Sequence, residues 1–208
     1  MRFIRPARIR KSRFVEMFGN GQFPALIIGD KFKTQSGGTP SSKKREYYEG
    51  GDIPWLTSGE VNLGVIRATK SFITKDGLDN SSAKWTPKGS VLVAMYGATA
   101  GKVGLLEVPV TTNQAVCSIL PRDGYEPYYL YHAVSAKEQW MISKTAGAAQ
   151  PNISQGIIRA MEIPDPPLSV QRQFANFILQ LDKSEFAIRK RLEKARLLYR
   201  AKLQEFFG

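Results

Sequence analysis

The sequence has 208 residues, of which 42% are hydrophobic and 11% aromatic, enough for one folded domain with an appendage. No apolar run approaches the roughly 20 residues that span a bilayer, and the basic N-terminus is not followed by the apolar stretch of a signal peptide. Cys117 is the only cysteine, which excludes disulfide crosslinks within the chain, so we expect a cytoplasmic protein without a membrane segment.

The net charge of +12 and the isoelectric point near 9.9 indicate a polyanionic partner, most often nucleic acid. The excess charge lies at the two ends of the chain. Residues 1–13 hold six cations and no acid, and residues 186–202 hold seven cations and one acid. The remaining residues hold 17 cations and 17 acids, so the body must bind a polyanion through local patches.

Two regions precede the C-terminal part of the chain. Residues 1–20 predict a short basic helix, since Phe14 and Phe18 recur at helical spacing before Gly19 ends the pattern. Residues 21–165 predict a globular body, in which short β-type runs alternate with turns rich in Gly, Pro, Asn and Ser. These runs and one helix indicate an α+β fold, with strands expected at 65–66, 91–95, 103–108 and 110–120 and the helix at 125–143.

Residues 166–208 predict a long helix that needs a partner. Pro-Asp-Pro-Pro at 164–167 is a rigid break, and Ser169 caps a helix that runs to about residue 206. A helix of roughly 55 Å, at 1.5 Å per residue, cannot bury a continuous apolar stripe on so small a domain, so we expect a homodimer. The alternative is that it folds back as an ordinary core helix. The expected coiled-coil seam comprises Phe174, Ile178, Leu181, Ile188, Leu192, Ala195 and Tyr199.

A seven-residue pattern occurs near both ends of the chain. Arg-Phe-Val-Glu-Met-Phe-Gly at 13–19 and Lys-Leu-Gln-Glu-Phe-Phe-Gly at 202–208 share the order basic, apolar, any residue, Glu, apolar, Phe, Gly. The repeat brackets the body, as it would if one unit had been cut out of a longer periodic molecule.

Motifs for catalysis and for cofactor binding are incomplete. The segment 97–103, Gly-Ala-Thr-Ala-Gly-Lys-Val, is one residue shorter than a phosphate-binding loop and ends in Val where Ser or Thr belongs. Its glycines suit a tight turn or a close approach to a DNA phosphate. His132 and Cys117 are each the only residue of their type, and the carboxylates lack the paired spacing of a nuclease metal site. We therefore expect a non-catalytic chain that binds no metal and no cofactor.

The segment 31–45 combines cations with small polar residues and glycines, a composition that suits DNA binding. Its cations would hold phosphates, and its Gln, Ser and Thr side chains would reach base edges from flexible glycines. The alternative is a solvated surface loop. Further polar clusters at 57–58, 96–99, 144–145 and 150–152 could line the same face. The DNA-binding residues that we predict are Lys31, Lys33, Gln35, Ser36, Thr39, Lys43, Lys44, Arg45, Thr57, Ser58, Tyr96, Thr99 and Lys102.

Seven short segments, taken in order, carry a family resemblance and together span nearly the whole chain. They are Ser-Gly-Gly-Thr-Pro (36–40), Ile-Pro-Trp-Leu-Thr-Ser-Gly-Glu (53–60), Gly-Ser-Val-Leu-Val-Ala (89–94), the segment 97–104, Asn-Gln-Ala (113–115), Ala-Gln-Pro-Asn-Ile-Ser (149–154) and the Pro-Pro-Leu-x-x-Gln element within 163–173. In this order they resemble the specificity subunits of type I restriction–modification systems.

The resemblance implies a mixed α/β recognition domain that binds double-stranded DNA and is similar to the recognition domain of adenine-N6 methyltransferases. Members of this family usually hold two such domains, separated by two long antiparallel helices, and each domain reads half of a bipartite site. They are not enzymes themselves. They dock methyltransferase subunits, which bring S-adenosylmethionine, and in the full complex restriction subunits, where ATP and Mg²⁺ are expected.

This sequence departs from the family pattern because it has one recognition domain and one long helix. The resemblance therefore implies a half-length subunit or a fragment of a full-length one. The helix over 166–208 would then serve as spacer and dimerisation element. The alternative function is a docking or anti-restriction scaffold whose body no longer reads DNA.

Overall fold

The continuously apolar runs of the sequence become strands that are buried on both faces. In the computed structural model, which describes residues 6–145 and 152–207, three such strands form the middle of a five-stranded sheet. Along the central strand, Val91 and Val93 face the helices, whereas Leu92 and Ala94 face a second sheet. In spatial order the five strands are β2 (Thr34–Ser36), β10 (Val116–Ile119), β7 (Val91–Ala94), β8 (Val103–Leu106) and β4 (Val65–Ile66).

A four-stranded sheet packs against one face of the five-stranded sheet. Leu56 of the smaller sheet meets Leu92 and Val116 of the larger sheet in a shared apolar cluster. The body therefore has three layers, with helices, the large sheet and the small sheet in that order. The strands of the small sheet are β5 (Ser71–Ile73), β3 (Ile53–Leu56), β9 (Val110–Thr112) and β6 (Trp85–Thr86).

The predicted strand over 110–120 is wrong in one respect, because the chain changes sheets within it. The turn lies at Asn113, whose backbone amide donates to the Leu56 carbonyl at 3.0 Å. The Val116 amide then donates to the Asn113 carbonyl at 3.3 Å, and β10 begins there. One apolar run thus supplies a strand to each sheet.

The predicted helix over 125–143 is likewise divided. The Ser135 hydroxyl donates to the Tyr131 carbonyl at 2.7 Å, and the Lys137 amide donates to the Val134 carbonyl at 3.0 Å, which tightens the last turn and ends the first helix. The two helices that result are α4 (Pro127–Ser135) and α5 (Glu138–Ser143). The remaining short helices are α2 (Ile28–Lys31), α3 (Lys75–Asp79), α6 (Gln155–Arg159) and the 3-10 helices η1 (Arg45–Tyr47) and η2 (Ser58–Leu63).

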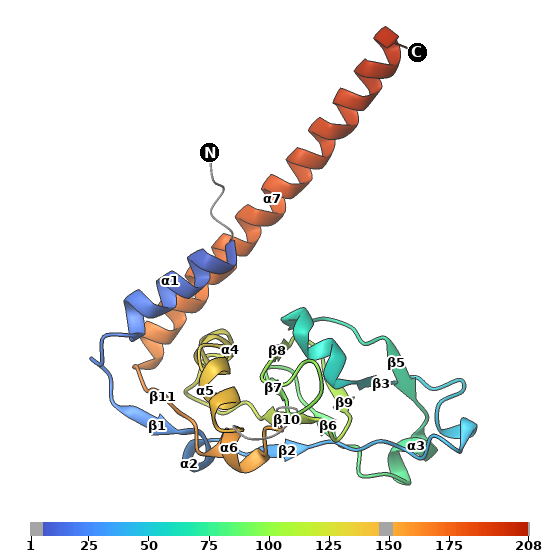
Figure 1. Ribbon diagram of the computed structural model, residues 1–208, viewed down its shortest axis with the longest axis vertical. Helices are drawn as coiled ribbons and strands as arrows, with labels where there is room; N and C mark the ends of the chain where they lie inside the picture. Colours follow the sequence, from blue (N-terminus) through green and yellow to red (C-terminus); the bar gives the residue numbers. More distant parts are fainter. Residues whose placement is uncertain (1–5, 146–151, 208) are drawn as a thin grey trace.

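The chain enters and leaves the body at one place. β1 (Ala25–Ile27) pairs antiparallel with β11 (Glu162–Pro164) in a two-stranded sheet. The segment Asp-Pro-Pro follows β11 directly, and because it disfavours helical geometry, it separates the body from the long helix that projects from it (Figure 1).

The long helix, α7 (Leu168–Phe207), has 40 residues and confirms the predicted long helix, although Ser169 lies inside it and is not its cap. Gln171 anchors its first turn and is only 1% exposed. The Gln171 side chain donates to the Pro166 carbonyl and accepts from the Glu126 backbone amide, both at 2.9 Å. The start of α7 is therefore tied to the start of α4.

The short helix α1 (Pro6–Phe18) lies antiparallel along the first half of α7 (Figure 1). Phe14 and Phe18 are buried against Phe174 and Tyr129, with ring centroids between 5.0 and 6.2 Å apart. Burial of each aromatic side chain stabilises the fold by about 1.5–3 kcal/mol, and each ring pair adds about 0.5–1.5 kcal/mol of stability. The predicted N-terminal helix is confirmed from Pro6 onward, while residues 1–5 lie outside the described residues.

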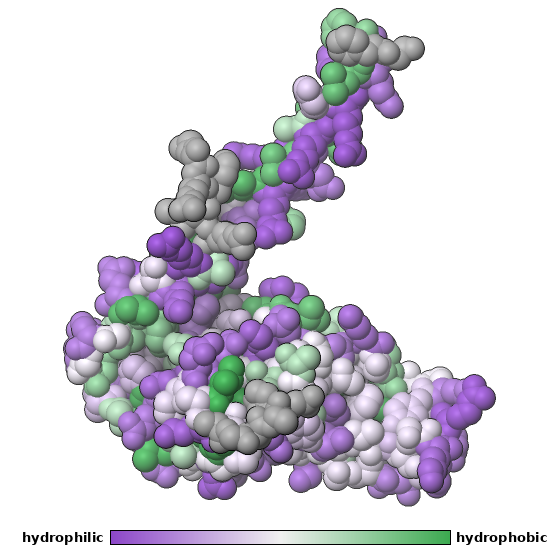
Figure 2. Space-filling view, viewed as in Figure 1, coloured by the Kyte–Doolittle hydropathy of each residue, from purple (hydrophilic) through white to green (hydrophobic). Residues whose placement is uncertain are grey.

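The predicted coiled-coil seam divides into two parts. Phe174 and Ile178 are buried in the core of the chain itself, under α1 and α4, so they are not open to a second chain. Leu181 is half-buried. The rest of the seam, Ile188, Leu192, Ala195 and Tyr199, is exposed along the projecting part of α7, where Figure 2 shows hydrophobic among hydrophilic side chains. The alternative of a core helix therefore holds for the first part of α7, whereas pairing of the exposed part with a second chain stays a prediction.

Within residues 6–145 and 152–207, no helix is both long and apolar enough to cross a membrane.

Candidate nucleic-acid interface

Polar segments that are far apart in the sequence meet at one end of the five-stranded sheet, where β2 and β7 end and β8 and β10 begin. We call this region the loop end. The Thr99 hydroxyl donates to the Ser58 carbonyl at 3.1 Å, and the Thr39 hydroxyl donates to the Gln114 side chain. Tyr96 forms an isolated backbone bridge with Asn152. The loop end therefore comprises Thr39, Ser58, Tyr96, Thr99, Gln114 and Asn152.

Convergence of the predicted polar clusters is thus only partial. The clusters at 57–58 and 96–99 meet at the loop end, together with the described residue of the cluster at 150–152. Residues 150 and 151 lie outside the described residues. Gln114 belongs to the loop end but is absent from the predicted site. The Asn-Gln-Ala motif at 113–115 is the sequence signal that could have added Gln114 to the site, although nothing in the sequence shows that Gln114 faces Thr39.

Glycines at the loop end serve turns and close packing. Gly97 and Gly101 both have φ of 81°, a conformation that suits glycine and closes the β7–β8 connection. Gly37 has another role, because a Cβ atom there would lie 1.9 Å from the Thr112 carbonyl oxygen. A Cβ on Gly38 would lie 2.2 Å from the Ser82 hydroxyl. The expectation of flexible glycines is therefore wrong at these two positions, which are packed against neighbouring backbone.

Two of the predicted base-contacting residues are engaged in the framework of the body. The Gln35 amide donates to the Trp85 carbonyl at 2.9 Å and to the Thr86 hydroxyl at 3.2 Å, and so links the two sheets. Thr57 precedes η2, and both its backbone amide and its hydroxyl donate to the carboxylate of Glu60, at 3.2 and 3.3 Å. Gln35 and Thr57 are also half-buried, whereas Thr39 and Gln114 at the loop end are exposed.

Glu60 is a buried residue that the sequence interpretation did not assign. Its side chain is held among backbone amides, with the residue 5% exposed. Besides Thr57, the backbone amide of Lys70 donates to it at 2.8 Å. The spacing Thr57-x-x-Glu60 is that of a capping box, which is a signal that the sequence does contain.

The predicted phosphate-contacting cations do not form one cluster. Lys31 and Lys33 stand before β2, at the end of that strand opposite to Thr39. Lys43 lies beyond Thr39, two residues before η1. Lys31, Lys33 and Lys43 are exposed and make no ion pair within the part of the chain that the structure describes.

Other predicted cations already have partners. Arg45 pairs with Glu49 at 2.7 Å on the surface. Lys44 donates to the Tyr47 hydroxyl at 2.9 Å and lies 4.8 Å above the Tyr47 ring. Lys102, which stands directly beside the loop end, pairs with Glu138 at 2.7 Å and is half-buried. The remaining predicted residue, Ser36, is half-buried in β2.

The described side chains offer little for catalysis. Among residues 6–145 and 152–207, no three His, Cys, Asp or Glu side chains are grouped to hold a metal ion. Burial raises the pKa of the Cys117 thiol to about 12, which disfavours the nucleophilic thiolate. Burial, with a smaller contribution from Arg10, lowers the pKa of His132 to about 4, and the His132 ring packs against Phe174 at 5.2 Å.

The layered body with its loop end and its projecting helix has the form of a recognition module. Comparison with known proteins identifies the family. The model of the "Type I restriction modification DNA specificity domain" family matches residues 26–196, so the chain belongs to this family. The match includes both the body and most of α7. The prediction of a non-catalytic chain agrees with the specificity role of the matched relatives.

Two relatives illustrate the match. The specificity subunit of the EcoR124I/EcoR124II type I restriction enzyme from Escherichia coli is 25% identical over 170 residues, which are 79% of this chain and 42% of that subunit. The MjaIX specificity subunit from Methanocaldococcus jannaschii is 31% identical over 160 residues, 74% of this chain and 37% of that subunit. The chain thus spans about two fifths of the length of these relatives.

The fold agrees with a solved structure. The crystal structure of the S subunit of a type I restriction–modification system from M. genitalium superimposes with a TM-score of 0.66 at 16% identity. The superposition covers 98% of this chain and 54% of that one. The predicted α+β fold, with a short N-terminal and a long C-terminal helix, is confirmed.

Proposed function

We propose that the chain is the DNA-reading part of a type I restriction–modification complex and reads one half of a bipartite site. The observation that carries the proposal is the extent of the family match, because residues 26–196 join the body to its projecting helix as one unit. The methyltransferase and restriction subunits of such a complex would supply the chemistry, with S-adenosylmethionine on the former and ATP and Mg²⁺ on the latter.

The loop end is the part of the body best suited to contact base edges. It presents the side chains of Tyr96, Thr99 and Gln114 on turns whose backbone is held by the two sheets. Amide and hydroxyl groups can donate to and accept from base edges in the major groove, and a good bidentate contact is worth about 1–3 kcal/mol of discrimination. The exposed Lys31, Lys33 and Lys43 would hold phosphates, which adds affinity without adding sequence preference.

The uncovered part of α7 would pair with a second copy of the chain. Its exposed apolar residues continue the seam that α1 covers lower on the same helix. Antiparallel pairing would place two identical bodies at a fixed separation, so the expected target is a half-site, a nonspecific spacer and the inverted half-site. The apolar residues in this part of the seam are Ile188, Leu192, Ala195, Tyr199, Leu203 and Phe206.

Binding-site selection from a random pool of DNA duplexes, with nonspecific competitor DNA present, tests the proposal. We expect the purified chain to enrich one motif. Gln114→Ala should relax preference at one base pair of that motif, whereas Gln139→Ala, which changes an exposed glutamine on α5, should leave the motif unchanged. Enrichment of no motif would overturn the proposal and favour the scaffold function.

A further inference from the structure

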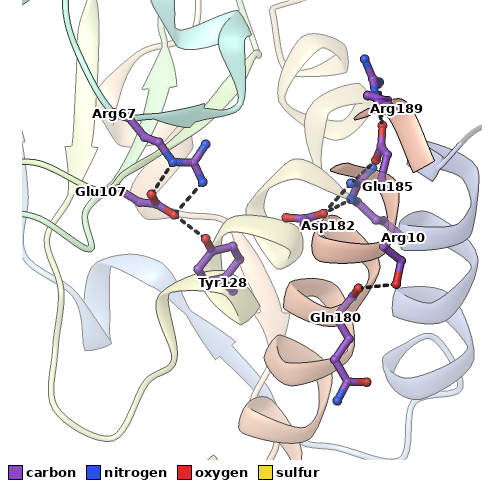
Figure 3. Close-up of polar contacts among 9 residues, drawn as sticks. Arg10, Arg67, Glu107, Tyr128, Gln180, Asp182, Glu185 and Arg189 are labelled. Carbon is purple, nitrogen blue, oxygen red and sulfur yellow. Dashed lines mark hydrogen bonds and ion pairs between the residues drawn. The ribbon is translucent and has the colours of Figure 1, made fainter. Parts of the chain in front are cut away.

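An ion-pair network fastens α1 to α7 (Figure 3), at the outer end of the part of α7 that is buried or half-buried among the described residues. The guanidinium of Arg10 contacts the carboxylates of Asp182 at 2.5 Å and Glu185 at 2.8 Å. Arg189 pairs with the other oxygen of Glu185 at 2.6 Å. Hydrogen bonds from Arg10 and then from Arg189 lower the pKa of Glu185, so that its charge is held firmly in place. We call these four residues the clamp.

The clamp is the outermost attachment of α7, and it lies beyond the part of the helix where Phe174 and Ile178 are buried under α1 and α4. An inner attachment is Gln171, which ties the first turn to α4. Beyond Glu185, every residue from 186 to 206 is exposed. That exposed part is about 30 Å long at 1.5 Å per residue, and it acts as a lever whose tip follows any tilt at its base.

A cleft beside the clamp gives α7 room to tilt. Its volume is about 610 Å³, and it lies between α7 and the wall of the body. Arg67, Glu107 and Tyr128 form part of that wall and are joined to one another, at 2.6 Å for the ion pair and 2.5 Å for the Tyr128 hydroxyl (Figure 3). The wall residues are thus held by one another, whereas at the cleft α7 is held by the ion pairs of Arg10 from α1.

We infer that Arg10 is a positioning residue that sets the spacer length between the two half-sites. The inference rests on the proposed function, because it needs two DNA-reading bodies joined through α7. A tilt of about 6° moves the tip of a 30 Å lever by about 3 Å, close to the rise of one base pair, about 3.4 Å. A tilt of this size at the clamp would therefore change the preferred spacer length by one base pair.

The main test compares Arg10→Gln and Asp182→Asn with Lys11→Gln, which removes an exposed cation from the next position of α1. Each variant is bound to duplexes that carry the selected half-sites with spacers of different lengths. We expect the wild-type chain and Lys11→Gln to prefer one spacer length. In the two clamp variants, the preference for this spacer over one that is a base pair longer should fall at least about fivefold, because Asp182→Asn loses one half-buried ion pair and Arg10→Gln loses two. The half-site motif should be unchanged. Unchanged spacer preference in both clamp variants would overturn the inference.

A second measurement does not depend on DNA. Spin labels on Ser42→Cys in the body and Leu198→Cys near the helix tip report the distance between body and tip, diluted with unlabelled protein to suppress distances between chains. The buried Cys117, with its raised pKa, should escape labelling. Arg10→Gln should broaden or shift this distance distribution, and Lys11→Gln should not. A distribution unchanged by Arg10→Gln would refute the clamp even if the chain binds no specific DNA.

Discussion

Replacing Lys43 and Lys102 separately should affect DNA binding in different ways, although both are cations of the predicted DNA-binding set. Lys43 is exposed without an ion pair among the described residues, whereas the Lys102 ammonium lies 2.7 Å from the Glu138 carboxylate. A free cation that contacts a phosphate contributes about 0.9 to the slope of log K against log salt concentration. Between 50 and 200 mM salt, one such contact changes the affinity by a factor of about 3.5.

Fluorescence anisotropy of a labelled duplex, titrated at several salt concentrations, measures this slope. Lys43→Gln should lower its magnitude by about 0.9 and weaken binding equally for specific and nonspecific duplexes. Lys102→Gln should leave the slope unchanged, because its charge is already neutralised within the chain. The reasoning is refuted if Lys102→Gln lowers the slope as much as Lys43→Gln does, or if Lys43→Gln has no effect on it.

Three further predictions concern the framework that holds the loop end and α7. In the folded chain the pKa of His132 is about 4, whereas in the unfolded chain it has its ordinary value of 6.5. Between these two pH values only the unfolded chain binds the proton, so the free energy of unfolding should fall as the pH drops from about 6.5 to 4. His132→Phe should remove this pH dependence of stability, which is at most about 1.4 kcal/mol per pH unit. Urea denaturation of both proteins at pH 7 and pH 5 measures it, and equal pH dependence of the two would contradict the prediction. Gln171→Leu removes the partners of the Glu126 amide and the Pro166 carbonyl, so urea denaturation should show a loss of about 1–3 kcal/mol, and a loss well below 1 kcal/mol would speak against an anchoring role. Gly37→Ala should lower the melting temperature. Gly59→Ala should not lower it, because the atom nearest to the added Cβ is 4.0 Å away. An unchanged melting temperature in both variants would disprove the close packing at Gly37.

Local signals were sufficient for part of the fold. Helical spacing and the proline break predicted α7, and glycine marked the end of α1. Continuously apolar runs indicated buried strands, but they could not show the change of sheet at Asn113. That turn depends on a hydrogen bond to Leu56, which lies 57 residues away in the sequence.

The partner of a helical seam could not be predicted from its spacing. Phe174 and Tyr199 belong to the same periodic stripe, yet the first is covered by α1 of the same chain and the second is exposed. Spacing states which face of a helix is apolar, and it does not state what covers that face. The covering helix, α1, is separated from α7 by the whole body.

Candidate site residues were predictable by type and only partly by place. Gln35 and Thr57 have side chains suited to base contacts, but they bond to Trp85 and Glu60 in the framework. The capping-box spacing could have assigned Thr57, whereas the partner of Gln35 is a backbone carbonyl 50 residues away. Polar composition alone therefore does not separate a residue that contacts a ligand from one that holds two sheets together.

Methylome sequencing of a host that carries this chain with its methyltransferase subunit tests the central claim most directly. We predict that one methylated motif appears only when the chain is present, and that it consists of two half-sites separated by a spacer of fixed length. Methylation that is independent of the chain, or the absence of any new motif, would contradict the proposal that this body reads DNA.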